Sequence, residues 1–102
     1  MKILVTGGKG VIGTPLVKEL NKRGHGVWTI DTMHGHELRH IRVDVGEYRQ
    51  LKDFWPGDFD FVYHLAGEFG RHNGQNYYEQ LWRTNAIGTR NMLELQREYG
   101  FR

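Results

Sequence analysis

Residues 1–13 constrain the fold more than any other stretch of this 102-residue chain. Ile3, Leu4 and Val5 form a continuous apolar run, which is typical of a central parallel strand covered on both faces. Four glycines follow within the next eight positions, and a helical pattern begins at Val11, before the last of them. The stretch therefore predicts a buried strand, a glycine-rich turn and the start of a helix, which is the opening unit of an α/β fold.

The spacing of these glycines fits two versions of one motif. Gly8-x-Gly10-x-x-Gly13 is the dinucleotide-binding fingerprint, and Gly7-x-x-Gly10-x-x-Gly13 is a sister version. In both, one glycine permits a sharp turn, another lets the backbone approach a pyrophosphate, and the last lets the helix pack closely on its strand. The helix N-terminus then offers N–H groups to the phosphates. The alternative is an ordinary tight turn, but the position between a strand and a helix favours the fingerprint.

Size and composition limit the other interpretations. We expect residues 1–102 to form one domain, near the small end of the usual range. The formal net charge of +2 is too small to favour nucleic acid as a partner. The chain has no cysteine, which excludes disulfides and thiolate chemistry. Since we find no signal peptide and no apolar run long enough to cross a membrane, we expect a soluble, cytoplasmic protein without a membrane partner.

Apolar periodicity predicts strands and helices in alternation along the rest of the chain. Strands are expected at residues 3–6, 26–30, 38–43 and 59–66, and helices at residues 11–23, 46–55 and 77–99. The inner face of the first helix is expected to carry Ile12, Leu16 and Leu20. The connection between the second and third strands is short, so we predict that it contains no helix.

Asp31 directly follows the second expected strand. Its distance from the glycine turn is close to the roughly 20 residues at which an acid grips the adenosine ribose in dinucleotide-binding folds. A carboxylate there accepts hydrogen bonds from a ribose diol and repels a 2′-phosphate, so Asp31 favours NAD over NADP. The alternative is an aspartate that only caps a loop.

Two further patterns suggest chemistry, and each has a simpler interpretation. His34, His36 and His40 have a spacing that could hold a metal ion, but we expect these side chains to face solvent or an adenosine. Tyr48 and Lys52 match a Tyr-x-x-x-Lys spacing that some dehydrogenases use for proton transfer. Their helix connects the third and fourth strands, away from the edge where ligands bind, so we expect only a surface pair.

Two polar segments near the end of the chain can each be interpreted in two ways. A loop after the fourth expected strand carries three polar side chains that face either a ligand or only water: Glu68, Arg71 and His72. The last helix carries a notch of small and polar residues, which indicates either close packing or a bound ligand: Thr84, Asn85, Gly88 and Thr89.

Five landmarks occur in an order that resembles a known family. They are residues 6–13 (TGGKGVIG), Asp31, Asp44-Val45, residues 64–67 (HLAG) and residues 84–94 (TNAIGTRNMLE). Together they resemble the N-terminal part of an extended short-chain dehydrogenase/reductase, of the NAD-dependent epimerase/dehydratase group that acts on nucleotide sugars. The last landmark is the most specific, and the resemblance covers essentially the whole chain. It implies a partial Rossmann fold, with a parallel sheet of four strands in the order 3-2-1-4 and flanking helices.

The resemblance also implies which residues hold the adenosine and pyrophosphate parts of NAD. Val11 and Ile12 would lie against the pyrophosphate, and Asp31 would hold the adenosine ribose. Asp44 would bond the adenine amino group, with Val45 beside it. The full set of implied NAD-binding residues is Gly7, Gly10, Val11, Ile12, Gly13, Asp31, Asp44, Val45, Leu65, Ala66, Gly67 and Thr84.

On the nicotinamide side, the resemblance implies contacts from two segments. Leu65, Ala66 and Gly67 would line the nicotinamide ribose. Thr84 would contact the cofactor from the last helix, and Asn85 would order that helix. The short connection after the second strand departs from the family pattern, so the resemblance does not define which of residues 32–36 would contact the adenosine.

The resemblance implies that the chemistry of the family lies outside residues 1–102. In that family, hydride passes to NAD while a tyrosine takes a proton, a lysine lowers the pKa of the tyrosine, and a serine or threonine orients the substrate. These residues follow on the fifth strand and the next helix, so we expect no catalytic residue in this truncated portion. A nucleotide sugar would bind only in the full-length parent protein, and epimerase, dehydratase and reductase are not distinguished.

Two interpretations of the chain remain open at this point. It is either the NAD-binding portion of an epimerase/dehydratase-type oxidoreductase, inactive alone, or a self-standing module that binds a dinucleotide or associates with itself without catalysis. In both cases the chain is expected to stop just before a fifth strand, which leaves the edge of the fourth strand unpaired. We therefore expect self-association through that edge or through the long last helix.

Overall fold

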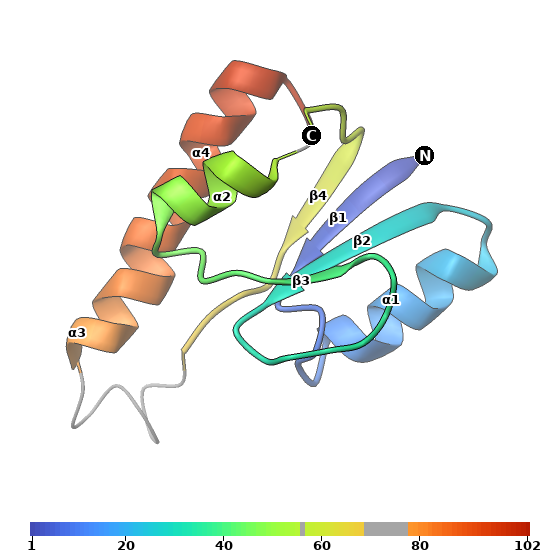
Figure 1. The fold of residues 1–102 in the computed structure, drawn as a ribbon, viewed down its shortest axis with the longest axis horizontal. Helices are drawn as coiled ribbons and strands as arrows, with labels where there is room; N and C mark the ends of the chain where they lie inside the picture. The colour runs from blue at the N-terminus through green and yellow to red at the C-terminus, as the bar shows by residue number, and fades with distance from the viewer. Residues whose placement is uncertain (56, 69–77) are drawn as a thin grey trace.

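Figure 1 shows the strands and helices of the computed structural model, which describes residues 1–55, 57–68 and 78–102. A parallel sheet of four strands has the order β3-β2-β1-β4, as the family resemblance implies. The strands are β1 (Lys2–Thr6), β2 (Gly26–Asp31), β3 (His40–Arg42) and β4 (Phe61–His64). The helices are α1 (Gly13–Lys22), α2 (Tyr48–Phe54), α3 (Tyr78–Leu81) and α4 (Gly88–Tyr99), with a π-helical segment, η2 (Trp82–Ile87), between α3 and α4.

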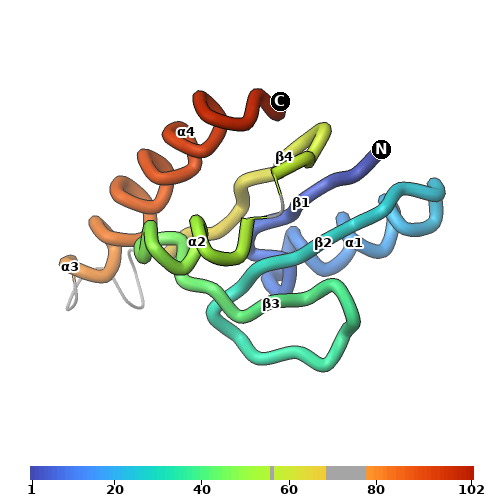
Figure 2. Tube along the Cα trace, turned by 45° about the horizontal axis from the view of Figure 1, so that its top comes forward, coloured from blue at the N-terminus to red at the C-terminus, as the bar shows by residue number. Residues whose placement is uncertain are grey.

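The side chains of β1 alternate between two hydrophobic clusters, one on each face of the sheet. Ile3 and Val5 pack with Leu20 of α1 and Val27 of β2. Leu4 belongs to the cluster on the opposite face, to which α2 and α4 contribute. In Figures 1 and 2, α1 accordingly covers one face of the sheet while α2 and α4 cover the other. Burial of β1 on both faces explains its unbroken apolar run.

The first helix differs from the predicted one at its beginning. α1 begins at Gly13, so Pro15 lies in the first turn, where a missing N–H costs no helical hydrogen bond. Ile12 precedes the helix and is 69% exposed, so its predicted place on the inner face is wrong. Leu16 and Leu20 pack against the sheet, as predicted.

The connection between β2 and β3 contains no helix, as the sequence predicts. β3 and β4 are both shorter than the expected strands, with three and four residues. The residues that flank β3 and β4 form turns and irregular segments, and these segments supply much of the functional site described below.

The last predicted helix, residues 77–99, consists of α3, η2 and α4 in succession, with residue 77 outside the described residues. These three segments together are called the long helix below. Gly100 ends it with φ of 74°, a left-handed conformation that glycine adopts without strain. Met92 and Leu95 are buried against the sheet, whereas Trp82 is 66% exposed. Part of the apolar surface predicted for this helix therefore faces outward.

The outer edge of β4 is partly paired by the end of the chain itself. The N–H of Arg102 donates to the carbonyl of Asp60 at 3.2 Å, and the N–H of Val62 donates to the carbonyl of Arg102 at 2.7 Å. These two bonds put Arg102 opposite Phe61 in the parallel pattern. The expectation that the edge of the fourth strand is left unpaired is therefore wrong at this position.

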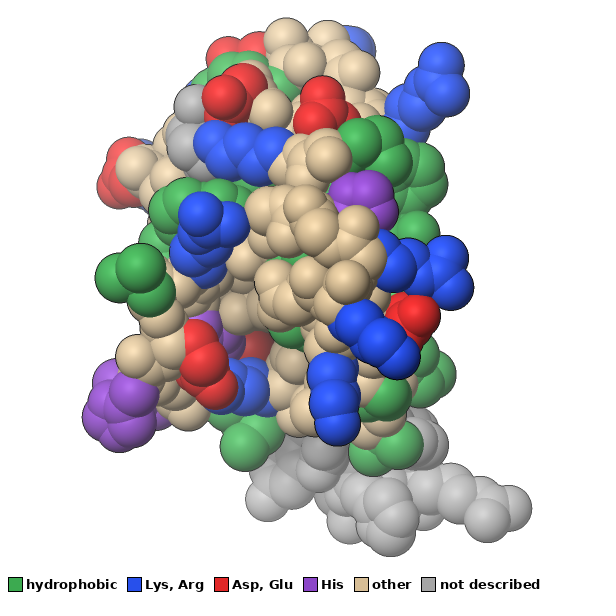
Figure 3. All heavy atoms as spheres, turned by 90° about the vertical axis from the view of Figure 1, so that its right-hand side faces the viewer, with side chains coloured by type: hydrophobic (Ala, Val, Ile, Leu, Met, Phe, Trp, Pro, Cys, Tyr) green, Lys and Arg blue, Asp and Glu red, His purple; other side chains and the backbone are tan. Residues whose placement is uncertain are grey.

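The surface at the right-hand side of Figure 1 is shown in Figure 3. On this face, several Lys and Arg side chains lie near one another at the lower right of the view with an acidic side chain among them, and the others are scattered. Among the described residues, no helix is both long and apolar enough to span a membrane.

Candidate functional site

The carboxyl ends of β1, β2 and β4 meet at one edge of the sheet, where the residues that follow them enclose a hollow of about 230 Å³. The chain leaves β1 toward β2 on one side, and β4 lies on the other side of β1. Such a reversal of strand order opens a crevice in which α/β proteins bind ligands. Most of the residues expected to bind a cofactor line this hollow: Gly7, Gly10, Asp31, Asp44, Val45, Leu65, Ala66 and Gly67.

A larger hollow of about 470 Å³ lies beside α1, where Val17, Val27 and Arg39 contribute to its walls. It runs along α1 and β2 and reaches the carboxyl edge of the sheet only at Gly8 and Lys9 of the glycine turn. Volume alone therefore does not identify the functional site, and the position at the reversal of strand order favours the smaller hollow.

The glycine turn has its shape because side chains would collide there. Gly7 has φ of 71°, and a Cβ atom on it would lie 2.9 Å from the backbone nitrogen of Ala66. A Cβ on Gly13 would lie 2.1 Å from the carbonyl oxygen of Gly7, so only glycine lets α1 begin this close to the turn. Gly8 packs against Thr29 of β2, where a Cβ would lie 2.7 Å from that side chain. The turn thus brings backbone, rather than side chains, to the hollow.

Asp31 lines the hollow and is held by backbone groups on both sides. One carboxylate oxygen accepts the N–H of Lys9 from the glycine turn at 3.0 Å, and the other accepts the N–H of Met33 at 3.0 Å. Asp31 therefore makes the loop-capping contacts of the simpler interpretation and also presents a carboxylate to the hollow. Because each oxygen has a second lone pair, these contacts leave acceptor capacity for a ligand.

Asp44 and Val45 form the opposite wall and are tied to the last helix. The carboxylate of Asp44 accepts the N–H of Gly46 at 2.8 Å and lies 3.3 Å from the guanidinium of Arg83 in η2. The carbonyl of Val45 accepts a hydrogen bond from the Asn91 amide at 2.8 Å. A hydrogen bond and an ion pair thus connect this wall to the long helix.

A polar chain joins the ends of β1 and β4 behind the hollow. The Thr6 hydroxyl accepts the N–H groups of Leu65 and Ala66 at 3.0 and 3.1 Å, and lies 2.7 Å from Nδ1 of His64. Since the hydroxyl already accepts two N–H groups, it donates its own hydrogen to Nδ1. Nε2 of His64 then carries the ring hydrogen and donates to the Thr89 hydroxyl at 3.1 Å.

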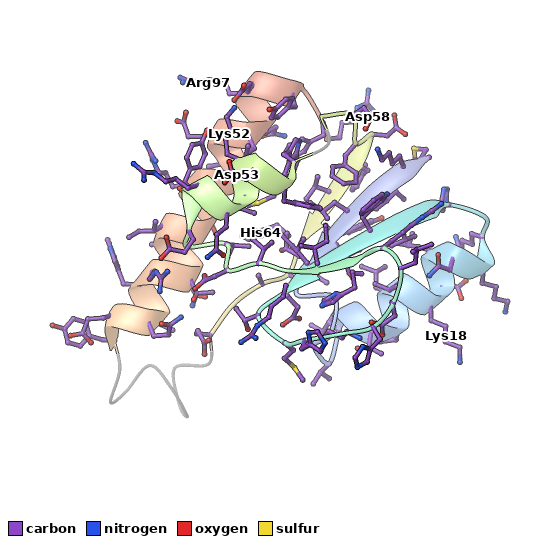
Figure 4. The ribbon with its side chains drawn as sticks, viewed as in Figure 1. Lys18, Lys52, Asp53, Asp58, His64 and Arg97 are labelled. Carbon is purple, nitrogen blue, oxygen red and sulfur yellow. The ribbon has the colours of Figure 1, made fainter. Side chains whose placement is uncertain are left out.

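Burial lowers the pKa of His64 below its ordinary value of 6.5, which favours the neutral ring that this chain of bonds requires. Figure 4 labels His64 at the end of β4, near the centre of the molecule. Beyond its place in a landmark, no role is predicted for His64 from the sequence. The available signal was that Thr6 and His64 end two neighbouring parallel strands, in which they are directly paired.

Four of the expected cofactor residues do not line the hollow. Val11 and Ile12 lie on the outside of the glycine turn and are 92% and 69% exposed. Gly13 is buried at the start of α1. Thr84 is buried in η2, where its hydroxyl accepts a hydrogen bond from Gln80 at 3.0 Å. Thr84 is therefore engaged within the helix rather than facing the hollow.

The polar notch of the last helix is used for packing and for one link to the hollow. A Cβ on Gly88 would lie 2.6 Å from the Val45 side chain, so glycine permits close approach of the helix. The Asn85 amide accepts the N–H of Glu68 at 2.8 Å and donates to its carbonyl at 3.2 Å. This pair of bonds anchors the segment that follows Gly67. Arg71 and His72, from the same predicted loop, lie outside the described residues.

The histidine pattern and the Tyr-x-x-x-Lys pattern both contain side chains that are bonded to other parts of the fold. His40 is buried, with Nδ1 2.7 Å from the Thr29 hydroxyl and Nε2 3.0 Å from the Met33 carbonyl, so its expected exposure is wrong. Among the described residues, no three His, Cys, Asp or Glu side chains are grouped to hold a metal ion. Lys52 pairs with Glu98 of α4, and this bond raises the pKa of Lys52.

Comparison with known proteins agrees with this geometry. The model of the NAD dependent epimerase/dehydratase family matches residues 3–102. A 2-alkyl-3-oxoalkanoate reductase of Stenotrophomonas maltophilia is 34% identical, over 98% of this chain and 31% of the relative. A UDP-N-acetyl-alpha-D-glucosaminuronate decarboxylase of Bacillus cytotoxicus is 30% identical, over 91% of this chain and 32% of the relative.

Solved structures with the same arrangement include a UDP-glucose 4-epimerase of Thermotoga maritima, with a TM-score of 0.88 and 26% identity, over 99% of this chain and 35% of that one. A UDP-glucose 4-epimerase of Thermus thermophilus, solved in complex with NAD, has a TM-score of 0.79 and 29% identity, over 98% of this chain and 35% of that one. The chain thus spans about a third of the length of these relatives. It belongs to the NAD-dependent epimerase/dehydratase family.

Proposed function

We propose that residues 1–102 form one NAD-binding unit of an oxidoreductase that acts on nucleotide sugars. The observation that carries this proposal is the hollow at the carboxyl edge of the sheet, which combines a side-chain-free glycine turn with two carboxylates, Asp31 and Asp44. A dinucleotide needs a close backbone approach at its pyrophosphate and acceptors for its ribose and adenine donors. The hollow offers these features.

The parts of the site suit different parts of NAD. The start of α1 has no side-chain cap and no acidic residue in its first turn, so its positive dipole end is free to face the pyrophosphate. Asp31 would accept the hydroxyls of the adenosine ribose, and Asp44 would accept the adenine amino group. Leu65, Ala66 and Gly67 would border the nicotinamide ribose. When bound, NAD supplies an acceptor for hydride.

Catalysis, in this proposal, needs residues beyond those of this chain. Since the relatives are about three times longer, we assign the substrate site and the proton-transferring residues to the part that this chain does not cover. Residues 1–102 alone would bind NAD without turning over a substrate. The alternative, a self-standing non-catalytic module, differs from this proposal only in what the natural protein contains beyond residue 102.

The adenosine side is tested by calorimetric titration of NAD into the chain and into an Asp31→Asn variant. The variant keeps the size of the side chain but removes the charge, and hydrogen bonds to a charged acceptor contribute about 1.5–3 kcal/mol. We expect NAD affinity to fall at least about tenfold, which is ~1.4 kcal/mol, and the preference for NAD over NADP to narrow.

The matched control is Asp53→Asn, because Asp53 is an exposed carboxylate on α2, labelled in Figure 4. This variant should bind NAD like the unmodified chain. Absence of NAD binding to the unmodified chain, or equal affinity in the Asp31→Asn variant, would contradict the proposal.

We also propose that the chain self-associates through the long helix. Tyr78 and Trp82 are 67% and 66% exposed, and they border an apolar hollow of about 570 Å³ on α3 and η2. Exposed aromatic side chains at such a hollow are the residues that dominate protein interfaces. The long helix is a better candidate than the edge of β4, because Arg102 already pairs with part of that edge.

A further inference from the structure

The segment from Val43 to Glu47, which carries Asp44, is attached to the long helix at three points. The Asn91 amide donates to the carbonyl of Val45, and Gly88 packs directly against the Val45 side chain. The third point is Arg83, whose guanidinium pairs with the carboxylates of both Asp44 and Glu47. Of the three, Arg83 is the one that pairs with a charged side chain lining the hollow, that of Asp44.

Arg83 has a geometry suited to holding Asp44 in one orientation. Its aliphatic part lies over Gly46, where a Cβ atom would be 2.8 Å from Cγ of Arg83. The Arg83 and Asp44 side chains are only 35% and 22% exposed, so solvent screens their attraction less than at an open surface. A planar guanidinium presents donors in fixed directions and can therefore bridge two carboxylates.

The two oxygens of Asp44 are consequently held from different sides. Oδ1 accepts the N–H of Gly46 at 2.8 Å, and Oδ2 lies 3.3 Å from the guanidinium. Without Arg83, the carboxylate would keep only the backbone bond and could rotate about it. The carboxylates of Asp44 and Glu47, both paired with Arg83, would also lose the cation that separates their negative charges.

We propose that Arg83 is a positioning residue that sets base specificity, by holding the Asp44 carboxylate where it accepts a hydrogen bond from the exocyclic amino group of adenine. This inference rests on the proposed binding of NAD and assigns a further residue to the adenine end of that site. Arg83 itself does not contact the cofactor. It acts through Asp44 and links base recognition to the long helix.

The test compares two dinucleotides on the same protein by calorimetry: NAD, and nicotinamide hypoxanthine dinucleotide, in which a carbonyl replaces the adenine amino group. The unmodified chain should bind NAD about tenfold more tightly, since the carboxylate meets an acceptor in the hypoxanthine compound. An Arg83→Gln variant should reduce this ratio to about two, mainly by weakening NAD binding. Arg83→Lys, which keeps the charge but lacks the planar guanidinium with its fixed donor directions, should give an intermediate ratio.

The ratio of the affinities for the two dinucleotides distinguishes positioning of Asp44 by Arg83 from a general structural role of Arg83. A variant that is merely less stable would bind both dinucleotides more weakly and leave the ratio unchanged. Arg90→Gln is the matched control, because Arg90 is exposed on the same long helix, and this variant should retain the full ratio.

Three results would overturn the inference, and they are distinguishable. An unchanged ratio in Arg83→Gln would show that Asp44 needs no help from Arg83, while NAD binding itself would stand. An equal loss of the ratio in Arg90→Gln would assign the effect to net charge. If the unmodified chain bound neither dinucleotide, both this inference and the proposed function would fail.

Discussion

At the scale of single residues, the site depends on polar side chains whose orientation is set by bonds made elsewhere in the fold. Thr6 and His64 illustrate this. The Thr6 hydroxyl holds the backbone of Leu65 and Ala66 at the hollow, and His64 connects that hydroxyl to Thr89 of α4. A neutral His64 ring is therefore part of the structure that shapes the nicotinamide side of the proposed site.

Protonation of His64 should destabilise the fold, because burial lowers the pKa of His64 in the folded state below the ordinary 6.5. Between these two pKa values the unfolded chain binds more protons than the folded one. The contribution to stability is thus fully present above about pH 6.5 and is lost as the pH falls below it. The loss is at most about 1.4 kcal/mol per pH unit, since a single proton is involved.

Urea unfolding at several values between about pH 7.5 and about pH 5.5 measures this effect. A His64→Gln variant should show a flatter dependence of the unfolding free energy on pH than the unmodified chain. His34→Gln is the control, because His34 is exposed, and it should keep the original slope. If His64→Gln keeps that slope as well, the titration belongs to another group.

At the scale of secondary-structure elements, the sequence predicts best where a pattern is local. The apolar run of β1 and the glycines at positions 7 and 13 lie next to one another in the chain, so their steric demands can be anticipated. Ile12 is mispredicted because apolar periodicity continues through a turn before α1 begins. The π-helical segment η2 was not predicted, since it reflects a shift in backbone hydrogen bonding that leaves no simple mark on side-chain periodicity.

Contacts between distant segments were the least predictable part of the site. The pairing of Arg83 with Asp44 joins residues from η2 and the turn after β3, and that of Arg102 with β4 depends on how the last turn leaves α4. A sequence pattern indicates which face of an element is apolar, but it does not give the relative rotation of two elements. The identities of Asp31 and Asp44 as candidates came from motif positions, whereas the bonds that orient them came only from the structure.

The exposed aromatic part of the long helix gives a prediction about association. We expect the apparent mass of the chain, measured by sedimentation, to rise with concentration over the micromolar range. A Trp82→Gln variant should remain monomeric, because Trp is enriched among the few interface residues whose truncation costs about 2 kcal/mol or more. Leu38→Gln is the control, since Leu38 is 96% exposed and lies on the connection between β2 and β3, away from the long helix. A chain that is monomeric at every concentration would contradict self-association.

At the scale of the whole molecule, the fold brings three segments of the chain to one edge of the sheet. The glycine turn follows β1, Asp31 ends β2, and Leu65, Ala66 and Gly67 follow β4. Because the strand order reverses at β1, these segments surround a single hollow rather than lying in a row. We therefore propose that NAD binds in this hollow, and not beside α1 or on the long helix.

The measurement that tests this claim most directly is an NMR titration of ¹⁵N-labelled chain with NAD, in which every backbone amide reports its own surroundings. We expect the largest shifts at amides around the hollow, in particular those of Gly7, Gly10, Asp31, Val45 and Ala66. The indole N–H of Trp82 should stay unchanged. Shifts centred on the hollow beside α1 or on Trp82, with the amides of Asp31, Val45 and Ala66 unaffected, would contradict this proposal.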